Sequence, residues 1–230
     1  VADGHRVAAV ALLHAWRFPD DERRVAAILR DAGFDHVGVS SDLAPFVKIV
    51  PRAATAVVDA ALSPVLEAYL DAVAGALPEG STLHVMTSAG ALAPRDRFHP
   101  KDSLLSGPAG GVVGAARAGQ RAGFDRVVAF DMGGTSTDVA RIDHGAPDVF
   151  EHAVGDAHLV APALAIESVA AGGGSICRVD AHGQLRVGPE SAGAHPGPAC
   201  YGMGGPLTIT DVDLLLGRLD PARFGIPIDP

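Results

Sequence analysis

The sequence has little cysteine and little positive charge. Its only cysteines are Cys177 and Cys200. Two thiols are too few for a disulfide framework or a zinc cluster, which excludes disulfide-rich and zinc-stabilised small domains. Lys and Arg number 18 against 27 Asp and Glu, for a net charge of −9. Nucleic-acid binding needs a basic face, so nucleic acid is excluded as a general partner. A nucleotide is not excluded, because backbone N–H groups and a metal ion can hold its phosphates.

Long apolar runs are also lacking. The most apolar windows, such as Val7–Leu13, are short and are followed by His14 and Arg17, so no membrane span is expected. The opening residues, VADGHRV, have neither the basic region nor the apolar core of a signal peptide, and we expect a cytoplasmic protein. The chain opens directly into a strand-like run and closes on a proline-rich tail at 224–230, which indicates a fragment of a larger protein.

The composition, 48% hydrophobic and 20% charged, is that of a globular protein. The first half begins with a predicted βαβ unit, in which a helix with apolar Val25, Ile28 and Leu29 on one face ends at Gly33. The expected elements are a strand at Arg6–Leu13, a helix at Asp20–Ala32, a strand at His36–Ser40, a helical region at Thr55–Leu77 interrupted near Ser63-Pro64, and a strand at Thr82–Thr87.

The second half is richer in glycine and in turns. Small residues at Gly107–Gly123 predict a helix packed very close to a neighbour. The expected elements after it are strands at Arg126–Asp131 and Thr137–Ile142 joined by a glycine turn, paired strands at Ser175–Val179 and Gly183–Val187, a long ordered loop at Pro189–Pro206, and a helix at Thr210–Leu219 with Thr210 or Asp211 as its N-cap.

The strongest local signal is DMGGTSTD at 131–138. Gly133 and Gly134 let the backbone approach a phosphate and turn successive N–H groups toward it. The hydroxyls of the three residues that follow can donate to phosphate oxygens. Asp131 lies where a carboxylate can hold Mg²⁺, which needs only one or two carboxylates because it keeps several waters. The alternative is a plain β-hairpin with solvated turn residues, but the complete motif after an apolar strand favours phosphate binding.

Two other phosphate motifs are excluded. No Gly-Lys-Ser/Thr follows the turn, so it is not a Walker loop. The turn leads into a second strand rather than a helix and lacks GxGxxG, so it is not a dinucleotide fingerprint.

DMGGTSTDV resembles the second phosphate loop of the sugar kinase/Hsp70/actin superfamily, in the form found in the hydantoinase A/5-oxoprolinase (N-methylhydantoinase A) family. The match covers nearly the whole chain and resembles the central part of that family. Further segments match in the same order, and the last of them is the most diagnostic: LLHAWRFPDDE at 12–22, LSGPAGGVVGA at 105–115, AGGGSI at 171–176 and RVGPESAGAHPGPACYG at 186–202.

The resemblance implies an α/β, ribonuclease H-like (actin/Hsp70-type ATPase) architecture with a mixed sheet, in a fragment of a two-lobed protein. Residues 1–103 would be the end of the first lobe and residues 104–230 an incomplete second lobe. The implied activity is ATP-dependent hydrolysis of a cyclic amide of the hydantoin or 5-oxoproline type. The implied cofactors are ATP and Mg²⁺, and the implied partners are the small-molecule substrate, a hydantoinase B-like subunit and further copies in an oligomer.

The resemblance also implies roles for individual residues. Five would contact the β- and γ-phosphates or the metal, and they are Asp131, Gly133, Gly134, Thr135 and Ser136. Asp138 is a second metal candidate that orients the loop or contacts Mg²⁺. Ser106-Gly107-Pro108 would begin a helix beside the cleft, with the Gly107 region facing the nucleotide.

Other candidates come from the residues themselves. Gly172, Gly173 and Gly174 with Ser175 form a second glycine turn, which is either a tight bend in a sheet or a backbone-lined pocket wall. Glu167 and Glu190 are candidate acid/base groups. Cys200 has nothing near it in sequence that would activate a thiolate, which favours a buried structural cysteine.

The chain departs from the family pattern at several positions. The usual Glu-Tyr-x-Arg-Thr-Ser-Thr region is here Lys48–Thr55, with only Arg52 and Thr55 retained. The usual Ser-Asn-Gly-Gly is Ser88–Ala91, and a usual His before the glycine turn is replaced by Glu167-Ser168. These changes indicate an altered substrate or a weakened enzyme. The first phosphate loop and the adenosine loop are missing, so we expect weak or no ATP turnover from these 230 residues alone.

Three alternatives stay open at this point: a subunit of an ATP-dependent ketone carboxylase, a nucleotide-binding module without its own hydrolase activity, and a kinase relative. A kinase would need a catalytic aspartate for its hydroxyl acceptor, and the sequence offers no clear candidate.

Overall fold

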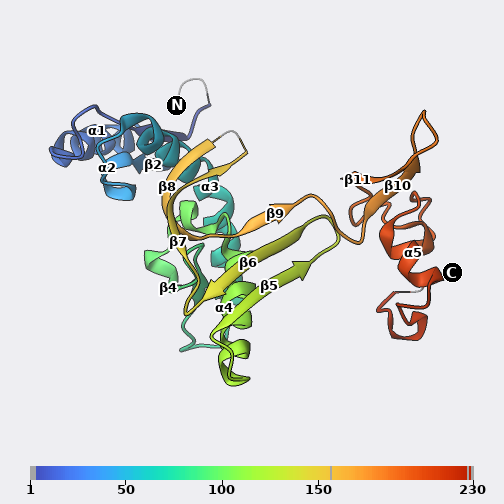
Figure 1. Cartoon of the computed structure of the whole chain (residues 1–230). Helices are drawn as coiled ribbons and strands as arrows, with labels where there is room; N and C mark the ends of the chain where they lie inside the picture. The colour runs from blue at the N-terminus through green and yellow to red at the C-terminus, as the bar shows by residue number, and fades with distance from the viewer. Residues whose placement is uncertain (1–3, 156, 227, 229–230) are drawn as a thin grey trace. The chain divides into compact units, whose positions relative to one another are not determined.

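The computed structural model describes residues 4–155, 157–226 and 228 (Figure 1). The chain divides into two compact units. Unit 1 comprises the described residues up to Ala118 together with Gly145–Ala165, and unit 2 comprises Gly119–His144 with the described residues from Ile166 onward. The proline-rich tail at 224–230 lies partly outside the described residues.

Unit 1 begins with the predicted βαβ unit. Strands β1 (Val7–Val10) and β2 (His36–Val39) pair in parallel, with Val7 opposite His36, and α1 (Pro19–Asp31) connects them. Proline in the first turn of α1 and acidic residues beside it suit a helix N-terminus. Gly33, at φ 95°, takes the chain out of the helix as expected.

The buried face of α1 differs from the apolar stripe in its sequence. Val25 and Ile28 are 37% and 66% exposed, whereas Glu22 is fully buried together with Ala26. The reason is that the Glu22 carboxylate accepts four hydrogen bonds from residues outside the helix, so the Glu22 side of α1 faces the interior.

Helix α3 (Ile49–Ala76) is continuous, so the predicted start at Thr55 and the interruption near Ser63-Pro64 were wrong. Pro64 cannot donate to the carbonyl of Ala60, yet packing of α3 against neighbouring elements keeps the helix together. The Ser63 hydroxyl also donates to the Asp59 carbonyl at 2.9 Å within this turn.

By length and composition α3 could cross a membrane, contrary to our reading of the sequence. The helix nevertheless packs against β1, β2 and β8 (Ala157–Leu164) and buries the charged side chains of Arg52 and Asp59, as a core helix does. A short helix, α2 (Ser40–Leu43), follows β2 directly and leads into the loop that precedes α3.

The rest of the described part of unit 1 consists of two hairpins and most of α4. Strands β7 and β8 form an antiparallel hairpin, and β8 lies against α3, where the Val160 N–H donates to the Thr55 hydroxyl at 2.9 Å. Buried residues of β8 face α3 and complete the core of this unit. The elements are β3 (His84–Met86), β4 (Leu92–Pro94), 3-10 turns at Arg95–Arg97 and Pro100–Ser103, α4 (Ser106–Arg121), β7 (Asp148–Val154) and β8 (Ala157–Leu164).

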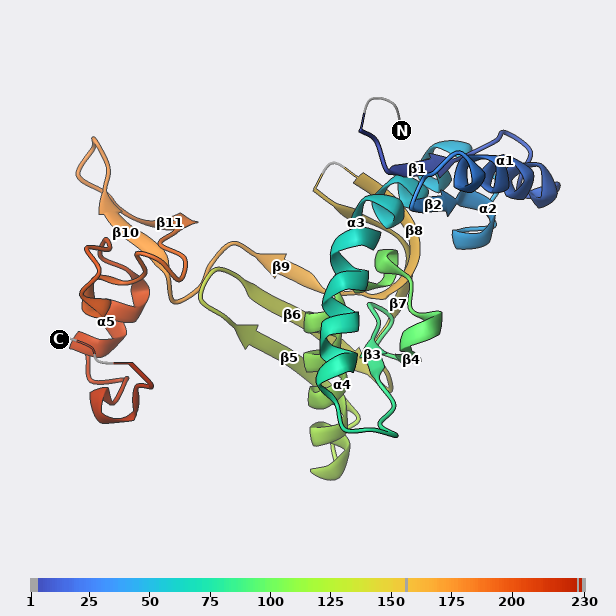
Figure 2. The same ribbon diagram turned by 180° about the vertical axis from the view of Figure 1, so that it is seen from behind.

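Unit 2 holds a three-stranded antiparallel sheet in the order β5-β6-β9, a second hairpin and a short helix (Figure 2). The strands are β5 (Arg126–Met132), β6 (Thr137–Asp143), β9 (Glu167–Val169), β10 (Ser175–Val179) and β11 (Leu185–Ser191), followed by a 3-10 turn at Ala199–Tyr201, α5 (Ile209–Leu215) and a 3-10 turn at Pro221–Arg223.

Two boundaries in unit 2 differ from the prediction. β11 continues to Ser191, into the segment expected to be a loop. α5 begins at Ile209 with Thr208 as its N-cap, rather than Thr210 or Asp211. Asp211 is instead the third helical residue, and its carboxylate accepts the Thr208 N–H at 2.7 Å, as in a capping box.

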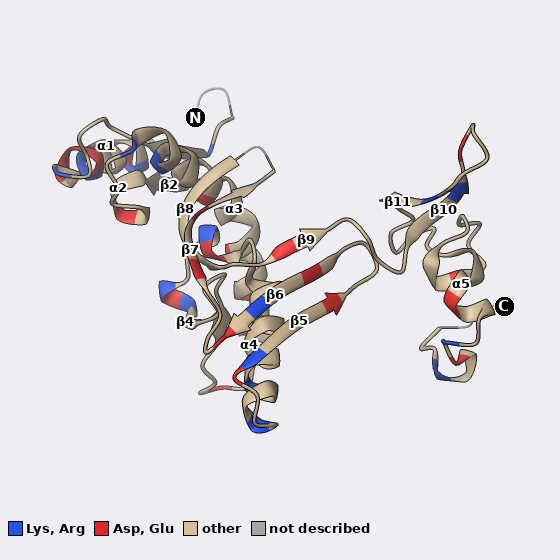
Figure 3. Ribbon diagram, viewed as in Figure 1, with Lys and Arg blue, Asp and Glu red and all other residues tan. Residues whose placement is uncertain are grey.

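Charges of both signs lie together in each unit. Figure 3 shows basic and acidic segments side by side on α1 and on the β5–β6 hairpin, so neither presents a face of one sign. The mixed α/β prediction is confirmed; among the described residues, one strand pair is parallel and the others are antiparallel. The assignment of residues 1–103 and 104–230 to two lobes stays a prediction.

Candidate phosphate-binding site

The predicted phosphate loop is the turn between β5 and β6 in unit 2. The strands pair from Arg126 opposite Asp143 to Met132 opposite Thr137, and the Gly133 N–H donates to the Ser136 carbonyl at 2.9 Å to close the turn. The strand–turn–strand geometry that the motif predicted is therefore present.

The carbonyl groups of the loop are held by the second glycine turn. The Gly133 carbonyl accepts the Gly173 N–H at 3.0 Å, and the Gly134 carbonyl accepts the Gly174 N–H at 2.7 Å. At the start of β6, the Thr137 hydroxyl donates to the Ala171 carbonyl at 2.5 Å. The two glycine turns, which the sequence separates, thus form one interlocked structure.

The interlock leaves no room for side chains. A Cβ on Gly172 would lie 2.6 Å from the Gly134 carbonyl carbon and 2.7 Å from the Gly133 oxygen. A Cβ on Gly174 would lie 2.9 Å from the Gly134 oxygen. Glycine is required here for close backbone approach rather than for an unusual φ. The glycine turn is a tight bend and also the support of the loop, so its two interpretations are compatible.

Three amides of the loop, unlike its Gly133 and Gly134 carbonyls, have no partner in the described part of the protein. Within the described residues, the N–H groups of Gly134, Thr135 and Ser136 donate to no protein acceptor. Gly134 and Thr135 are exposed and Ser136 is half-buried. Successive free amides at a turn can donate together to one anion, as phosphate oxygens require.

Asp131 and Asp138 lie directly opposite each other in the β5–β6 register. Side chains paired in this way lie on one face of the sheet with Cβ atoms about 4.5–5.5 Å apart, and like charges there repel. Two carboxylates beside free amides suit Mg²⁺, which takes oxygen ligands and needs only one or two from protein. The residues present therefore fit the metal that the motif predicted.

Two supporting residues were not predicted. Thr210 donates to the Gly173 carbonyl through its N–H at 2.8 Å and its hydroxyl at 2.9 Å, which fixes the second glycine turn. The Ser191 hydroxyl lies 3.5 Å from that of Thr135 and accepts the Gly193 N–H at 3.1 Å. The only signal for Ser191 was its place in the diagnostic segment at 186–202.

The remaining candidates lie apart from this turn along the chain. Glu190 is an exposed residue of β11 whose carboxylate pairs with Arg178 at 2.7 Å, and this partner lowers its pKa. Glu167 is exposed on β9, opposite Val139. Gly107 lies in the first turn of α4. The roles assigned to these three residues stay predictions.

Cys200 lies in a buried network. The Asp211 carboxylate accepts the Cys200 N–H at 2.8 Å and the Thr208 hydroxyl at 2.9 Å. Burial, together with the nearby Asp211 carboxylate, raises the pKa of the Cys200 thiol to about 11. A thiol in this state is not a nucleophile at neutral pH, which supports a structural role.

We expect Cys200 to resist thiol reagents at pH 8. A thiol with a pKa near 11 has about a hundredfold less thiolate at pH 8 than one at the ordinary value of 9, and burial limits access further. Labelling with a chromogenic disulfide, using Cys177→Ser to isolate Cys200, measures the rate. Unfolding in urea should restore rapid labelling; rapid labelling of the folded variant would contradict the buried network.

The chain matches the hydantoinase/oxoprolinase family model over residues 52–227. It is 45% identical to a 5-oxoprolinase from Saccharomyces cerevisiae, over 97% of this chain and 18% of that protein. It is 38% identical to the caprolactamase subunit alpha from Pseudomonas jessenii, over 96% of this chain and 33% of that subunit.

The chain is also similar in structure to a solved protein. The nucleotide-free structure of acetone carboxylase, from work on ATP-dependent acetone carboxylation, matches with a TM-score of 0.75 and 29% identity, over 99% of this chain and 34% of that chain. The chain thus spans about a fifth to a third of the length of these relatives. Its DMGGTSTD turn, its interlocked glycine turn and a family match over most of its length show that the chain belongs to the hydantoinase/oxoprolinase family.

Proposed function

We propose that this chain supplies part of the ATP-binding site of an enzyme that hydrolyses a cyclic amide. Two relatives carry names of that kind, a 5-oxoprolinase and a caprolactamase subunit. The observation that carries the proposal is the loop at 133–136, where neighbouring backbone groups bind the carbonyls and leave three successive amides free.

The loop residues would bind the β- and γ-phosphates. The free N–H groups of Gly134, Thr135 and Ser136 would donate to phosphate oxygens, and the hydroxyls of the last two would add further donors. Because Gly173 and Gly174 fix the carbonyls, these donors are in place before the ligand arrives, which is where electrostatic stabilisation is most effective.

Asp131 and Asp138 would hold Mg²⁺, directly or through water. When bound, ATP would supply the phosphoryl group that activates the amide oxygen, and Mg²⁺ would neutralise charge on the phosphates. The protein's own part is to position the phosphates and to keep two carboxylates on one face of the hairpin.

The partners follow from the same relatives. A caprolactamase chain described as subunit alpha supports a second subunit, which we propose to be hydantoinase B-like, in an oligomer in the cytoplasm. Gly107 and the candidate acid/base groups Glu167 and Glu190 would contribute if the rest of the parent protein brings them to the cleft.

Ketone carboxylation is the second candidate function. The acetone carboxylase match supports it, because that chain also belongs to an ATP-dependent system and has the same local fold. The nucleotide-binding half of the proposal is the same for both reactions.

The test is ATP consumption by the full-length parent protein with its partner subunit. We expect stimulation by 5-oxoproline, hydantoin or another lactam and not by glycerol. Stimulation by acetone with bicarbonate alone would select the carboxylase, and stimulation by glycerol alone would contradict both. The isolated 230-residue chain should show weak or no ATP turnover, since it carries a single phosphate loop.

Replacing Asp131 with Asn should lower ATP turnover by the parent enzyme about 10- to 100-fold, the usual effect of disturbing a metal site. The change keeps the shape of the side chain and removes its charge. Steady-state turnover against Mg²⁺ concentration measures it, and excess Mg²⁺ should restore part of the activity.

Asp148→Asn is the matched control for this variant. It removes a carboxylate at the start of β7, in unit 1, and should leave both turnover and Mg²⁺ dependence unchanged. Equal activity of wild type and Asp131→Asn at every Mg²⁺ concentration would refute the assignment of Asp131.

A further inference from the structure

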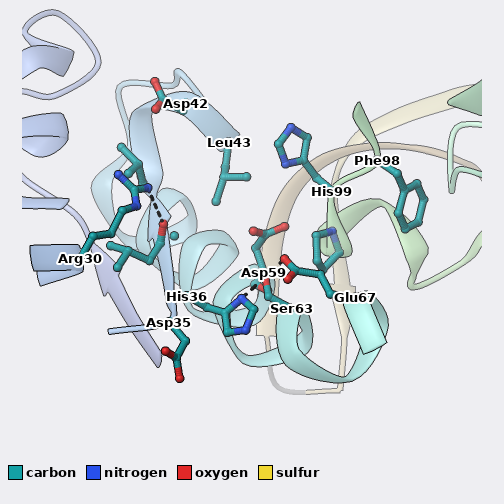
Figure 4. A pocket seen from close by; sticks show the side chains of 14 residues that line it. Arg30, Asp35, His36, Asp42, Leu43, Asp59, Ser63, Glu67, Phe98 and His99 are labelled. Carbon is teal, nitrogen blue, oxygen red and sulfur yellow. Dashed lines mark hydrogen bonds and ion pairs between the residues drawn. The ribbon is translucent and has the colours of Figure 1, made fainter. Parts of the chain in front are cut away.

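Unit 1 contains a cavity of about 340 Å³ that the proposed function does not use (Figure 4). It lies between β2, α2, α3 and the segment at 98–100, all of which belong to unit 1. The volume is at the lower end of the range for small-molecule sites.

The buried carboxylate of Asp59 lines this cavity and is only 5% exposed. One of its oxygens, Oδ1, accepts the Lys101 N–H at 2.9 Å. The other oxygen, Oδ2, accepts no hydrogen bond from the residues that the structure describes. Figure 4 draws this carboxylate between the side chains of His99 and Glu67.

Among the described residues, no Lys, Arg or His side chain forms an ion pair with Asp59 within 4.0 Å. The nearby Lys101 ammonium pairs with Asp102 at 2.6 Å, and the Arg30 guanidinium donates to the Val37 carbonyl at 3.4 Å. Burial raises the pKa of Asp59, and the Lys101 N–H and His99 offset this only in part. A buried charge of this kind is costly unless a partner compensates it.

The charges around the cavity select the type of partner. Four carboxylates and one guanidinium line it, and the two histidines include His36, whose Nδ1 lies 3.5 Å from the Glu67 carboxylate. An anion is therefore disfavoured. Within the described part of the chain, no group of three or more metal-ligating side chains is placed to hold a metal ion. An organic cation suits these charges, because its ammonium group can pair with the carboxylates without the ligand set that a metal ion needs.

The other lining residues are apolar. They surround the acidic end with aliphatic and aromatic surface, and they are Val37, Val39, Leu43, Phe98 and Pro100. Such a lining suits the short carbon chain of a ligand whose charged end is held by the carboxylates.

We propose that this cavity binds a small aliphatic primary amine, with its ammonium group on Asp59 Oδ2 and Glu67 and its carbon chain against Leu43 and Phe98. The site is independent of the phosphate loop, and it would remain if the proposed function failed.

The test uses the 230-residue chain and n-butylammonium, with 1-butanol as the neutral probe of nearly the same shape. Titrations followed by amide chemical shifts at pH 7 should show saturable binding of the amine, with shifts at residues 36–43, 59–67 and 98–101. We expect 1-butanol to bind at least about tenfold more weakly, because hydrogen bonds to charged groups contribute most of the affinity.

Asp59→Asn removes the charge, keeps the shape and keeps an acceptor for the Lys101 N–H. It should weaken amine binding about tenfold or more and leave butanol binding unchanged. Glu79→Gln, at an exposed acid in the turn after α3, is the matched control and should bind like wild type. A thermal melt verifies folding.

If Asp59→Asn does not fold, Glu67→Gln tests the proposal in its place. Glu67 is half-exposed on the surface of α3, so replacing it should not disturb folding. Weaker binding by that variant supports the proposal. Equal binding of amine and butanol, unchanged affinity in the folded variants, or no saturable binding to wild type would each overturn it.

Discussion

Replacing Arg52 with Met is expected to lower the free energy of unfolding by about 3–5 kcal/mol. Arg52 and Glu22 are both fully buried, and their side chains meet at 3.1 Å. The variant would leave the Glu22 carboxylate buried without a cation, which is the situation that makes breaking a buried ion pair so destabilising. Urea unfolding followed by circular dichroism measures the change.

The network around this pair shows why the effect is large. The Arg52 guanidinium also donates to the Leu12 carbonyl at 2.7 Å, and Glu22 accepts the Leu12 N–H at 2.7 Å and the Ser41 N–H at 2.8 Å. Together the two side chains connect α1, α3, the loop after β1 and the start of α2. Losing either one removes the support of several backbone groups at once.

A double replacement distinguishes the cost of an unpaired buried charge from the loss of the other contacts of the Arg52 side chain. Arg52→Met combined with Glu22→Leu should recover part of the lost stability, because no charge then remains buried. Arg23→Met is the control: Arg23 pairs with Asp42 at 2.8 Å but is exposed, and its loss should change stability by less than about 1 kcal/mol. Equal effects at Arg52 and Arg23 would contradict this account.

The pair also predicts acid sensitivity. Burial alone would raise the pKa of Glu22, but hydrogen bonds from Ser40, Leu12 and Ser41 lower it overall. A carboxyl with a lowered folded-state pKa stabilises the fold above its unfolded pKa, and this contribution is lost as the pH falls through the folded value. The doubly substituted chain should therefore lose less stability on acidification than wild type.

The elements that could be predicted are those with local signals. The βαβ unit, the helix over the glycine-rich segment and the β5–β6 hairpin followed from periodicity and turn residues, and the structure confirms them. The close packing expected along that helix was wrong for most of its length, because a Cβ added at Gly107 or Gly114 would meet open space. The continuous α3 could not be predicted, because a proline usually ends a helix and only packing against other elements overrides that preference. The burial of Glu22 on α1 could not be predicted either, because its partner Arg52 lies 30 residues later in the sequence.

The positions where the chain keeps the family pattern have a structural explanation. Of the altered segment at 48–55, Arg52 and Thr55 are retained, and both are fully buried. Arg52 binds Glu22 and Thr55 accepts the Val160 N–H. These residues connect elements of unit 1. Their presence in this chain is therefore explained by the stability of the fold, without any role in substrate binding.

The segment at 88–91 follows the same rule. Ser88 is fully buried, and its hydroxyl donates to the Asp102 carbonyl at 2.8 Å and accepts the Leu105 N–H at 3.0 Å. Gly90 has φ 74°, and a Cβ there would lie 2.9 Å from Val113. The retained residues are again those that the backbone requires. No local pattern distinguishes such positions from functional ones.

The phosphate loop itself was predictable, but its support was not. The sequence left Gly172–Gly174 open between a bend and a pocket wall, because the Gly133 and Gly134 carbonyls that these residues bind lie about 40 residues earlier in the printed sequence. This support leads to the second large prediction.

Gly172→Ala should lower ATP turnover by the parent enzyme about 100-fold. The added Cβ would meet backbone atoms of Gly133 and Gly134 at 2.6–2.7 Å, and backbone cannot rotate away as a flexible side chain can. The loop must therefore shift, and a displacement of about 1 Å in a positioning element has an effect of this size. Overpacking should also destabilise unit 2 by about 1–3 kcal/mol.

Gly114→Ala is the matched control, because Gly114 lies in α4 with open space around its Cβ position. Alanine favours the helix by up to about 1 kcal/mol relative to glycine, so this variant should be at least as stable as wild type and fully active. If Gly172→Ala is folded and turns over ATP like Gly114→Ala, then the interlock does not position the phosphates. If turnover falls while butylammonium still binds unit 1 with wild-type affinity, the loss originates in unit 2, because the amine cavity belongs to unit 1 and its binding shows that this unit stays folded.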